Sequence, residues 1–139
     1  MRPGRRDELG AALAVWREAE AVPSVSDDPA SLGRLLLTSG DALLVAEVDG
    51  RVAGTIIAGW DGWRGNLYRL AVRPTARRRG IALQLVAEAE RRLSARGARR
   101  LTALVMSERD PAVALWLTAA YSHDTRVGRY VRTLPGPAP

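Results

Sequence analysis

The sequence predicts one α/β domain built on a mixed, mostly antiparallel sheet that is flanked by helices. The chain has 139 residues, 47% of them hydrophobic, which suits one compact domain with its own core. Asp49-Gly50 separates two apolar segments and favours a β-hairpin turn. Later, a long amphipathic segment separates two β-rich segments, and such a helix joins parallel strands by a crossover. We therefore expect a single domain over residues 1–139, with 135–139 as a flexible tail.

The first half of the chain predicts two helices and then the hairpin. Asp7 is the expected N-cap of the first helix, and apolar residues recur at helical spacing from Leu9 to Ala19. A turn-rich break separates it from the second helix. The N-terminus is short, and Met1-Arg2-Pro3 leaves almost no room for a strand before the first helix. The expected elements are helices over 7–19 and 29–38 and strands over 42–48 and 52–60.

The second half predicts the crossover and a final helix. Pro74 ends the strand that leads into the crossover, and Gly97 fits the C′ position after the long helix. Asp110 is the expected N-cap of the final helix, with Pro111 at its first position. The expected elements are strands over 66–72, 100–106 and 127–134 and helices over 81–96 and 110–119.

Composition excludes several classes of site. The chain has no Cys and a single His, His123, so we expect no disulfide, no cysteine nucleophile and no metal site. No apolar run reaches the roughly 18 residues that a membrane span needs, and no signal sequence is recognisable, so we expect a cytoplasmic protein without membrane contact. The net charge is +6 and all 21 basic residues are Arg. This excess indicates either a phosphate or nucleic-acid binder or a compositional bias, and we favour the bias.

One segment predicts a site for pyrophosphate. A strand feeds a loop that contains Arg77, Arg78, Arg79 and Gly80, and a helix begins directly afterwards. Free backbone N–H groups and the helix dipole favour an anion at such a helix N-terminus. Gly80 lets the backbone approach a bulky ligand, and the arginines add positive charge. The loop is neither a Walker loop nor a dinucleotide fingerprint.

This segment resembles the pyrophosphate loop of the GNAT superfamily of N-acetyltransferases, Gln/Arg-x-x-Gly-x-Gly/Ala, which Arg77, Gly80 and Ala82 match. Upstream lies Leu70-Ala71-Val72-x-Pro at the family's spacing. Downstream, residues 109–121 resemble the family helix Asn-Glu-Pro-Ala-x-x-Leu-Tyr-x-x-x-Gly-Phe, and residues 59–65 resemble a loop of a short bacterial subgroup. The resemblance covers about residues 42–121.

The resemblance implies a GNAT-like fold with one splayed strand pair, in which the pantetheine arm of acetyl-CoA lies along an unpaired strand edge. A backbone N–H near Leu70 would polarise the thioester carbonyl, and an amine would attack it directly, leaving CoA as product. The cofactor-binding residues expected on this basis are Leu70, Ala71, Val72, Arg77, Arg78, Arg79, Gly80, Ile81, Ala82, Arg109 and Trp116. The chain departs from the family pattern at three positions: it has Arg109 where the family has Asn, Trp116 where the family has Tyr, and Ala120 where the family has Gly.

The catalytic acid and base are not assigned by the sequence. Asn66 stands where some relatives carry a Glu base, and Tyr68 and Glu108 are the weak candidates for a relay or base. We expect Trp116 either to bound the thiol end of the cofactor or simply to pack in the core. The residues expected to border the acceptor are Trp60, Asp61, Trp63, Arg64 and Asn66.

The leading hypothesis is an acetyl-CoA-dependent N-acetyltransferase that acts on a primary amine of a small molecule, peptide or protein, with a homodimer among the assemblies to consider. A catalytically weak acyl-CoA-binding module is the alternative, and a basic nucleic-acid-binding protein is a more distant one. Aromatic residues make up 5% of the chain and Phe is absent, which argues against a platform for stacking bases, so we expect no specific nucleic-acid partner.

Overall fold

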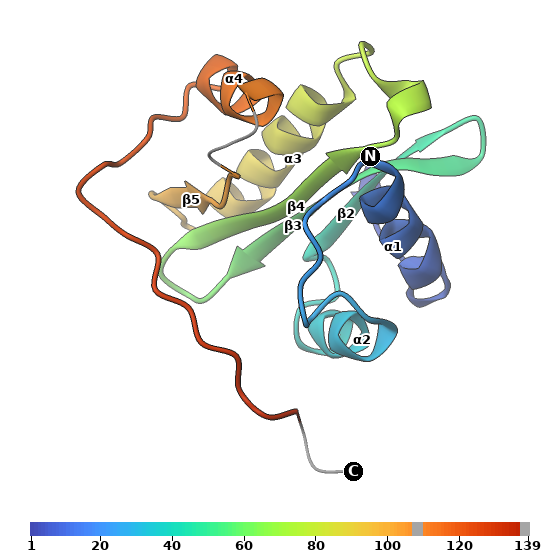
Figure 1. Ribbon diagram of the computed structural model, residues 1–139, viewed down its shortest axis with the longest axis horizontal. Helices are drawn as coiled ribbons and strands as arrows, with labels where there is room; N and C mark the ends of the chain where they lie inside the picture. The colour runs from blue at the N-terminus through green and yellow to red at the C-terminus, as the bar shows by residue number, and fades with distance from the viewer. Residues whose placement is uncertain (107–109, 137–139) are drawn as a thin grey trace.

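A computed structural model describes residues 1–106 and 110–136 and shows a five-stranded sheet with helices on both faces (Figure 1). The strands lie in the order β1-β2-β3-β4-β5; β4 and β5 are parallel, and every other neighbouring pair is antiparallel. Their bounds are β1 (Arg2–Pro3), β2 (Leu43–Val48), β3 (Arg51–Trp60), β4 (Gly65–Val72) and β5 (Leu101–Ala103). This confirms the mixed, mostly antiparallel sheet with one parallel crossover.

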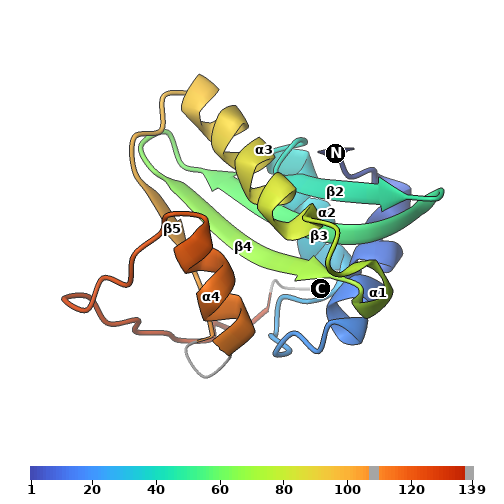
Figure 2. The same ribbon diagram turned by 90° about the horizontal axis from the view of Figure 1, so that it is seen from above.

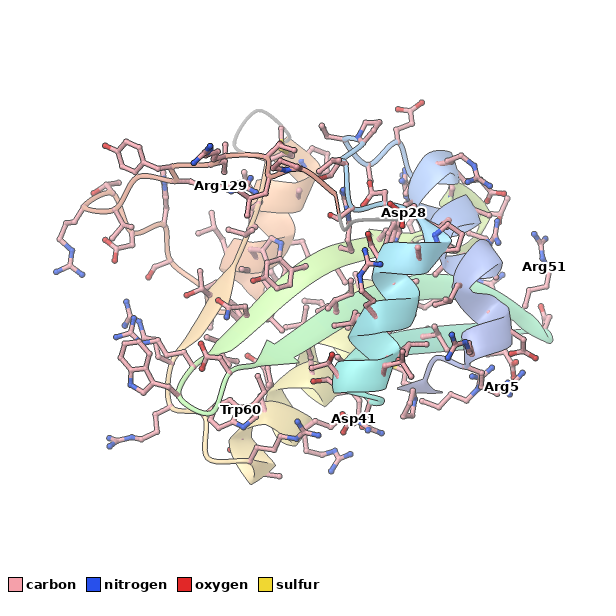
Figure 3. All side chains as sticks on the ribbon, turned by 90° about the horizontal axis from the view of Figure 1, so that it is seen from below. Arg5, Asp28, Asp41, Arg51, Trp60 and Arg129 are labelled. Atoms are coloured by element: carbon pink, nitrogen blue, oxygen red, sulfur yellow. The ribbon has the colours of Figure 1, made fainter. Side chains whose placement is uncertain are left out.

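The helices form two layers, one on each face of the sheet. Their bounds are α1 (Leu9–Glu18), α2 (Pro29–Thr38), α3 (Ile81–Ala95) and α4 (Asp110–Thr118). Helices α3 and α4 lie over the face seen in Figure 2, and α1 and α2 lie over the opposite face, seen in Figure 3. Strand residues alternate between these layers. Leu44 therefore packs in the core under α3, whereas Leu43 and Val45 pack in the core under α1 and α2.

The start of the chain differs from the expectation. Asp7 does not cap α1; it lies in a short 3-10 turn, Arg6–Glu8, that precedes the helix. Glu8 is the organising carboxylate, because it accepts the Arg5 backbone N–H at 2.9 Å and both guanidinium nitrogens of Arg2 at 2.7 and 2.8 Å. The five residues before this turn also leave room for a short strand, since β1 pairs with the start of β2.

The parallel pair is shorter than the sequence predicted, and this shortness opens the sheet. Strand β5 spans three residues instead of seven and pairs with β4 only from Gly65 to Leu67. The last bond across the pair runs from the Leu104 N–H to the Leu67 carbonyl at 3.3 Å. Beyond it, β4 continues to Val72 with no strand beside it on that side among residues 1–106 and 110–136, as expected for a splayed pair.

The strand expected over 127–134 is wrong. Residues 121–136 contain no helix or strand and run as an extended segment past β5 (Figure 1). Tyr130 is 97% exposed, and the apolar residues around it, Val127, Val131 and Leu134, are exposed as well. Weak alternation of apolar residues gives no strand where no neighbouring edge or apolar surface is contacted.

Candidate functional site

The loop between β4 and α3 presents its charged side chains to solvent. After Val72 a 3-10 turn, Pro74–Ala76, leads to Arg77, Arg78 and Arg79, all exposed. Arg78 and Gly80 both have positive φ, at 67° and 73°. Residues 77–80 form a turn followed by a bend, and successive backbone N–H groups in a turn conformation make a concave anion-binding surface. A non-glycine residue at positive φ is a strained conformation of the kind found at ligand sites.

The N-terminus of α3 adds further donors to this loop. The first helical hydrogen bond runs from the Gln84 N–H to the Gly80 carbonyl at 3.0 Å, so the N–H groups of Ile81, Ala82 and Leu83 precede it and remain free of the helix. A Cβ at Gly80 would meet no protein atom closer than Gln84 Nε2 at 3.8 Å. It would therefore project into open space in front of the helix. These residues fit a pyrophosphate, because donors converge on that space and nothing of the protein fills it.

Arg73 anchors the start of the loop. This buried side chain donates from Nε to the Val52 carbonyl at 2.7 Å and forms an ion pair with Glu18 at the end of α1. A hydrogen bond from Arg73 lowers the pKa of Glu18 below its ordinary value. The exit of β4 is thus fixed to β3 and to α1, and this fixes where the exposed arginines begin.

A β-bulge in β4 reverses which residues face the open edge. Before the bulge, Gly65 donates its N–H to the Arg100 carbonyl at 3.1 Å, on the β5 side. The register with β3 shifts at Thr55 to Ile57, opposite Arg69, which has a φ of 53°. After the bulge, Arg73 donates its N–H to the Ala53 carbonyl at 2.8 Å, on the β3 side.

Because backbone groups alternate along a strand, this pattern has a direct consequence. The N–H groups of Leu70 and Val72 point to the open edge of β4, where no strand in the described part of the chain pairs with them. Without the bulge these groups would point toward β3. The edge can therefore accept an extended, amide-bearing ligand that leads toward the arginine loop.

Buried polar contacts hold the bulge in place. The Thr55 hydroxyl donates to the Arg69 carbonyl at 2.9 Å, and Trp16 Nε1 donates to the Thr55 hydroxyl at 2.8 Å. The Arg69 guanidinium crosses to the loop between α1 and α2, where it donates to the Val22 carbonyl at 3.0 Å and to Asp27 at 2.6 Å. Sequence analysis missed these residues, because an Arg in a β-rich segment gives no signal of a positive φ.

The expected acceptor residues separate into two groups. Asn66 and Tyr68 precede the bulge on β4, on the face that carries α1 and α2, and Tyr68 is 37% exposed. The others, Trp60, Asp61, Trp63 and Arg64, lie at the β3–β4 turn, the opposite end of β4 from the arginine loop (Figure 1). Trp63 and Leu70 are separated by roughly 20 Å of extended chain. The structure therefore does not bring this turn next to Leu70.

Trp116 is buried in the core under α3, and its ring meets Tyr121 edge to face with centroids 4.9 Å apart. The Tyr121 hydroxyl donates to Glu90 at 2.9 Å and ties the end of α4 to α3. Burial and the neighbouring Glu90 raise the pKa of Tyr121 above its ordinary value, which makes it a poor proton donor. Glu108 and Arg109 lie outside the described residues.

Residues 1–106 and 110–136 lack two further features. Within them, no group of three or more His, Asp or Glu side chains is arranged to hold a metal ion. Among the same residues, no helix has the length and apolar character needed to cross a membrane.

Comparison with known proteins agrees with this geometry. The profile of the acetyltransferase (GNAT) family matches residues 11–120. A protein named acetyltransferase from Pectobacterium atrosepticum is 32% identical over 117 residues, covering 84% of this chain and 83% of the relative. An aminoglycoside N-acetyltransferase solved with CoA superposes with a TM-score of 0.72 at 20% identity, covering 96% and 93% of the two chains. The ribosomal-protein-S18-alanine N-acetyltransferase of Escherichia coli gives 0.72 at 21% identity, covering 88% and 77%. The chain therefore belongs to the acetyltransferase (GNAT) family, whose members transfer an acetyl group from acetyl-CoA to an amine.

Proposed function

We propose that residues 70–72 and 77–82 hold acetyl-CoA and that a primary amine attacks its thioester directly. The bulge at Arg69 carries this proposal, because it turns two free N–H groups onto the edge that leads to the arginine loop. The loop and the first turn of α3 would hold the pyrophosphate. The pantetheine arm would lie along β4, where the N–H of Leu70 would donate to the thioester carbonyl as negative charge develops there.

Trp116 and Arg109 keep narrower roles in this proposal. Trp116 is positioned as core packing beside Tyr121, and we assign it no proton transfer, because an indole N–H cannot release a proton near neutral pH. Arg109 precedes α4, and by resemblance it would contact the pantetheine arm. The departing thiolate would then take its proton from water or from the acceptor ammonium.

The acceptor would enter on the face of β4 that carries Asn66 and Tyr68, and its pKa matters. Deprotonating a lysine-like amine at pH 7 costs about 4.6 kcal/mol, whereas an α-amino group costs about 1 kcal/mol. Asn66 cannot act as a base, and we assign Tyr68 at most a relay through water. We therefore propose a weakly basic primary amine, such as a peptide α-amino group or a small molecule with a low amine pKa.

Assembly and location follow from the same proposal. The outer edge of β5 has no strand beside it among the described residues, and unpaired edges favour association with another strand. We propose a homodimer formed along this edge, which size-exclusion chromatography with light scattering would test. Dependence on acetyl-CoA supports a cytoplasmic location.

Gly80→Val tests the cofactor site, because its side chain would project into the space proposed for pyrophosphate. Gly50→Val is the matched control: its φ is 76° against 73° for Gly80, and a Cβ there meets nothing within 4 Å, whereas a Cβ at Gly80 meets only Gln84 Nε2, at 3.8 Å. Both variants should lose similar stability from backbone strain. Only Gly80→Val should lose acetyl-CoA affinity by calorimetry, by tenfold or more.

Equal affinity in the two variants would contradict the site assignment. A second assay measures release of free CoA across amines, α-amino peptides and aminoglycosides. Tight acetyl-CoA binding without CoA release from any acceptor would favour the catalytically weak binding module instead.

A further inference from the structure

A second candidate site, an open pocket, lies at the opposite end of β4 from the proposed cofactor site. It has a volume of about 520 Å³ and lies between the β3–β4 turn and the segment that joins α3 to β5. Eight residues line it: Trp60, Gly62, Trp63, Arg64, Arg96, Gly97, Arg99 and Arg100. Figure 3 shows Trp60 at this end of the sheet, with Asp41 along the same end. A pocket of this volume accommodates a ligand of mononucleotide size.

The charge of this pocket is positive, and carboxylates compensate only part of it. The charge of Arg96 is already paired, because this side chain donates to both carboxylate oxygens of Asp41 at 2.8 Å. Arg100 lies 3.8 Å from Asp124, whose carboxylate hydrogen-bonds mainly to Arg126. Within residues 1–106 and 110–136, Arg99 makes no hydrogen bond or ion pair.

Asp61, the nearest carboxylate in the turn, does not neutralise the pocket arginines through an ion pair. Its oxygen accepts the backbone N–H groups of Trp63 and Arg64, both at 2.8 Å. These hydrogen bonds lower the pKa of Asp61 and fix the turn. Arg64, Arg99 and Arg100 are therefore available to an anion, and planar guanidinium groups bind phosphate oxygens in pairs.

An aromatic platform stands beside this charge. Trp63 is 68% exposed, although burial of its ring would be favourable. Arg64 covers one face of the ring, with its guanidinium carbon 3.9 Å from the centroid. The rigid turn thus presents an indole that is already stacked on one side. Bases stack on such rings irrespective of sequence, and this is the platform that composition alone did not reveal.

We propose that this pocket binds a nucleoside phosphate, with the base stacked on Trp63 and the phosphate held by Arg99 and Arg100. The ligand is either a free nucleotide or a nucleotide within a single strand, since both present the same base and phosphate. The inference goes beyond acetyl transfer and is independent of where CoA binds, because the pocket shares no residue with the arginine loop.

The test is titration of the full chain without CoA, because CoA itself carries an adenine and phosphates and would compete for the pocket. Binding that depends on Trp63 and Arg99 is assigned to this pocket and not to the arginine loop. The probes are adenosine 5′-monophosphate by calorimetry and a labelled ten-nucleotide oligo(dA) by fluorescence anisotropy. Trp63→Ala should weaken binding about 5- to 150-fold, the range for loss of one stacked base. Arg99→Ala should weaken it as well and lower the salt dependence of oligonucleotide binding by about one phosphate contact.

Arg17→Ala, which removes an exposed arginine of α1, is the matched control and should bind within twofold of the parent. Trp63→Phe should recover part of the affinity that Trp63→Ala loses. Binding of the monophosphate identifies a free nucleotide, and binding of the oligonucleotide alone identifies a strand. No binding of either probe, or equal affinity of Trp63→Ala, Arg99→Ala and Arg17→Ala, overturns the proposal. If Gly80→Val kept its acetyl-CoA affinity, the proposed cofactor site would be wrong, but the nucleotide titrations of this pocket would still stand.

Discussion

Replacing Arg69 tests both the β-bulge at this residue and the Arg69 clamp, by which we mean its side-chain contacts with Asp27 and the Val22 carbonyl. In Arg69→Ala the ion pair with Asp27 is lost, and so are the hydrogen bond to the Val22 carbonyl and the guanidinium contact over the Trp16 ring at 5.3 Å. The paired side chains are 21% and 18% exposed. That exposure lies between surface pairs, worth about 0–1 kcal/mol, and buried pairs, where removing one partner costs about 3–5 kcal/mol. We therefore expect a loss of about 2 kcal/mol, or roughly 7 °C in melting temperature.

The sharper measurement compares Arg69→Ala with Arg69→Gly by urea unfolding. Both variants lose the clamp, but only glycine adopts a φ of 53° without steric cost. Arg69→Gly should therefore be more stable than Arg69→Ala by about 1 kcal/mol. In a regular strand the order would be reversed, because glycine destabilises strand interiors. A less stable Arg69→Gly would refute the bulge, and a coupling energy with Asp27→Asn near zero would refute the clamp.

Two further predictions concern stability. Ala120, just after α4, has a φ of 70°, so Ala120→Gly should raise the free energy of unfolding by about 1 kcal/mol; an unchanged or lower urea midpoint would contradict this. Hydrogen bonds from Arg2 lower the pKa of Glu8 from 4.5 to about 2, so this carboxylate stabilises the fold above about pH 4.5 and loses that effect as pH falls toward 2. Glu8→Gln should therefore cost about 2–3 kcal/mol at pH 7 and little at pH 2. Glu47→Gln, which removes only the exposed partner of Arg2, should cost less than about 0.5 kcal/mol at either pH.

The parts of the fold that the sequence predicted correctly are encoded locally. Asp49 and Gly50 have φ values of 52° and 76°, the two positive angles that a tight hairpin turn requires. Gly97 has a φ of 106° directly after α3, as expected for its C′ position. In each case the dihedral preference of one or two residues determines the backbone, and no distant contact is needed to predict it.

The parts that sequence analysis missed depend on contacts between distant segments. The Arg69 bulge depends on Thr55, which bonds its carbonyl, and on Asp27, which bonds its guanidinium, while Trp16 in turn bonds the Thr55 hydroxyl. Thr55 lies on β3, Trp16 on α1 and Asp27 in the loop between α1 and α2. The second pocket gathers Arg99 and Arg100 with a turn that lies more than thirty residues earlier in the sequence. In the amino-acid composition, these arginines contribute only to the net positive charge, which does not show where they gather. The strand expected over 127–134 failed for a related reason, because alternation alone cannot supply a neighbouring edge.

One residue links the two sides of the proposed reaction centre. The backbone of Arg69 turns the N–H groups of Leu70 and Val72 onto the edge proposed for the cofactor. Its side chain, through Asp27 and the Val22 carbonyl, holds the loop between α1 and α2 on the face where the acceptor would enter. A change that loosens this loop must therefore also loosen the bulge that orients the oxyanion donor. Acceptor recognition and thioester polarisation would then depend on the same clamp, so Arg69→Ala should lower both acetyl-CoA affinity and acceptor affinity, although its side chain contacts neither proposed ligand site directly.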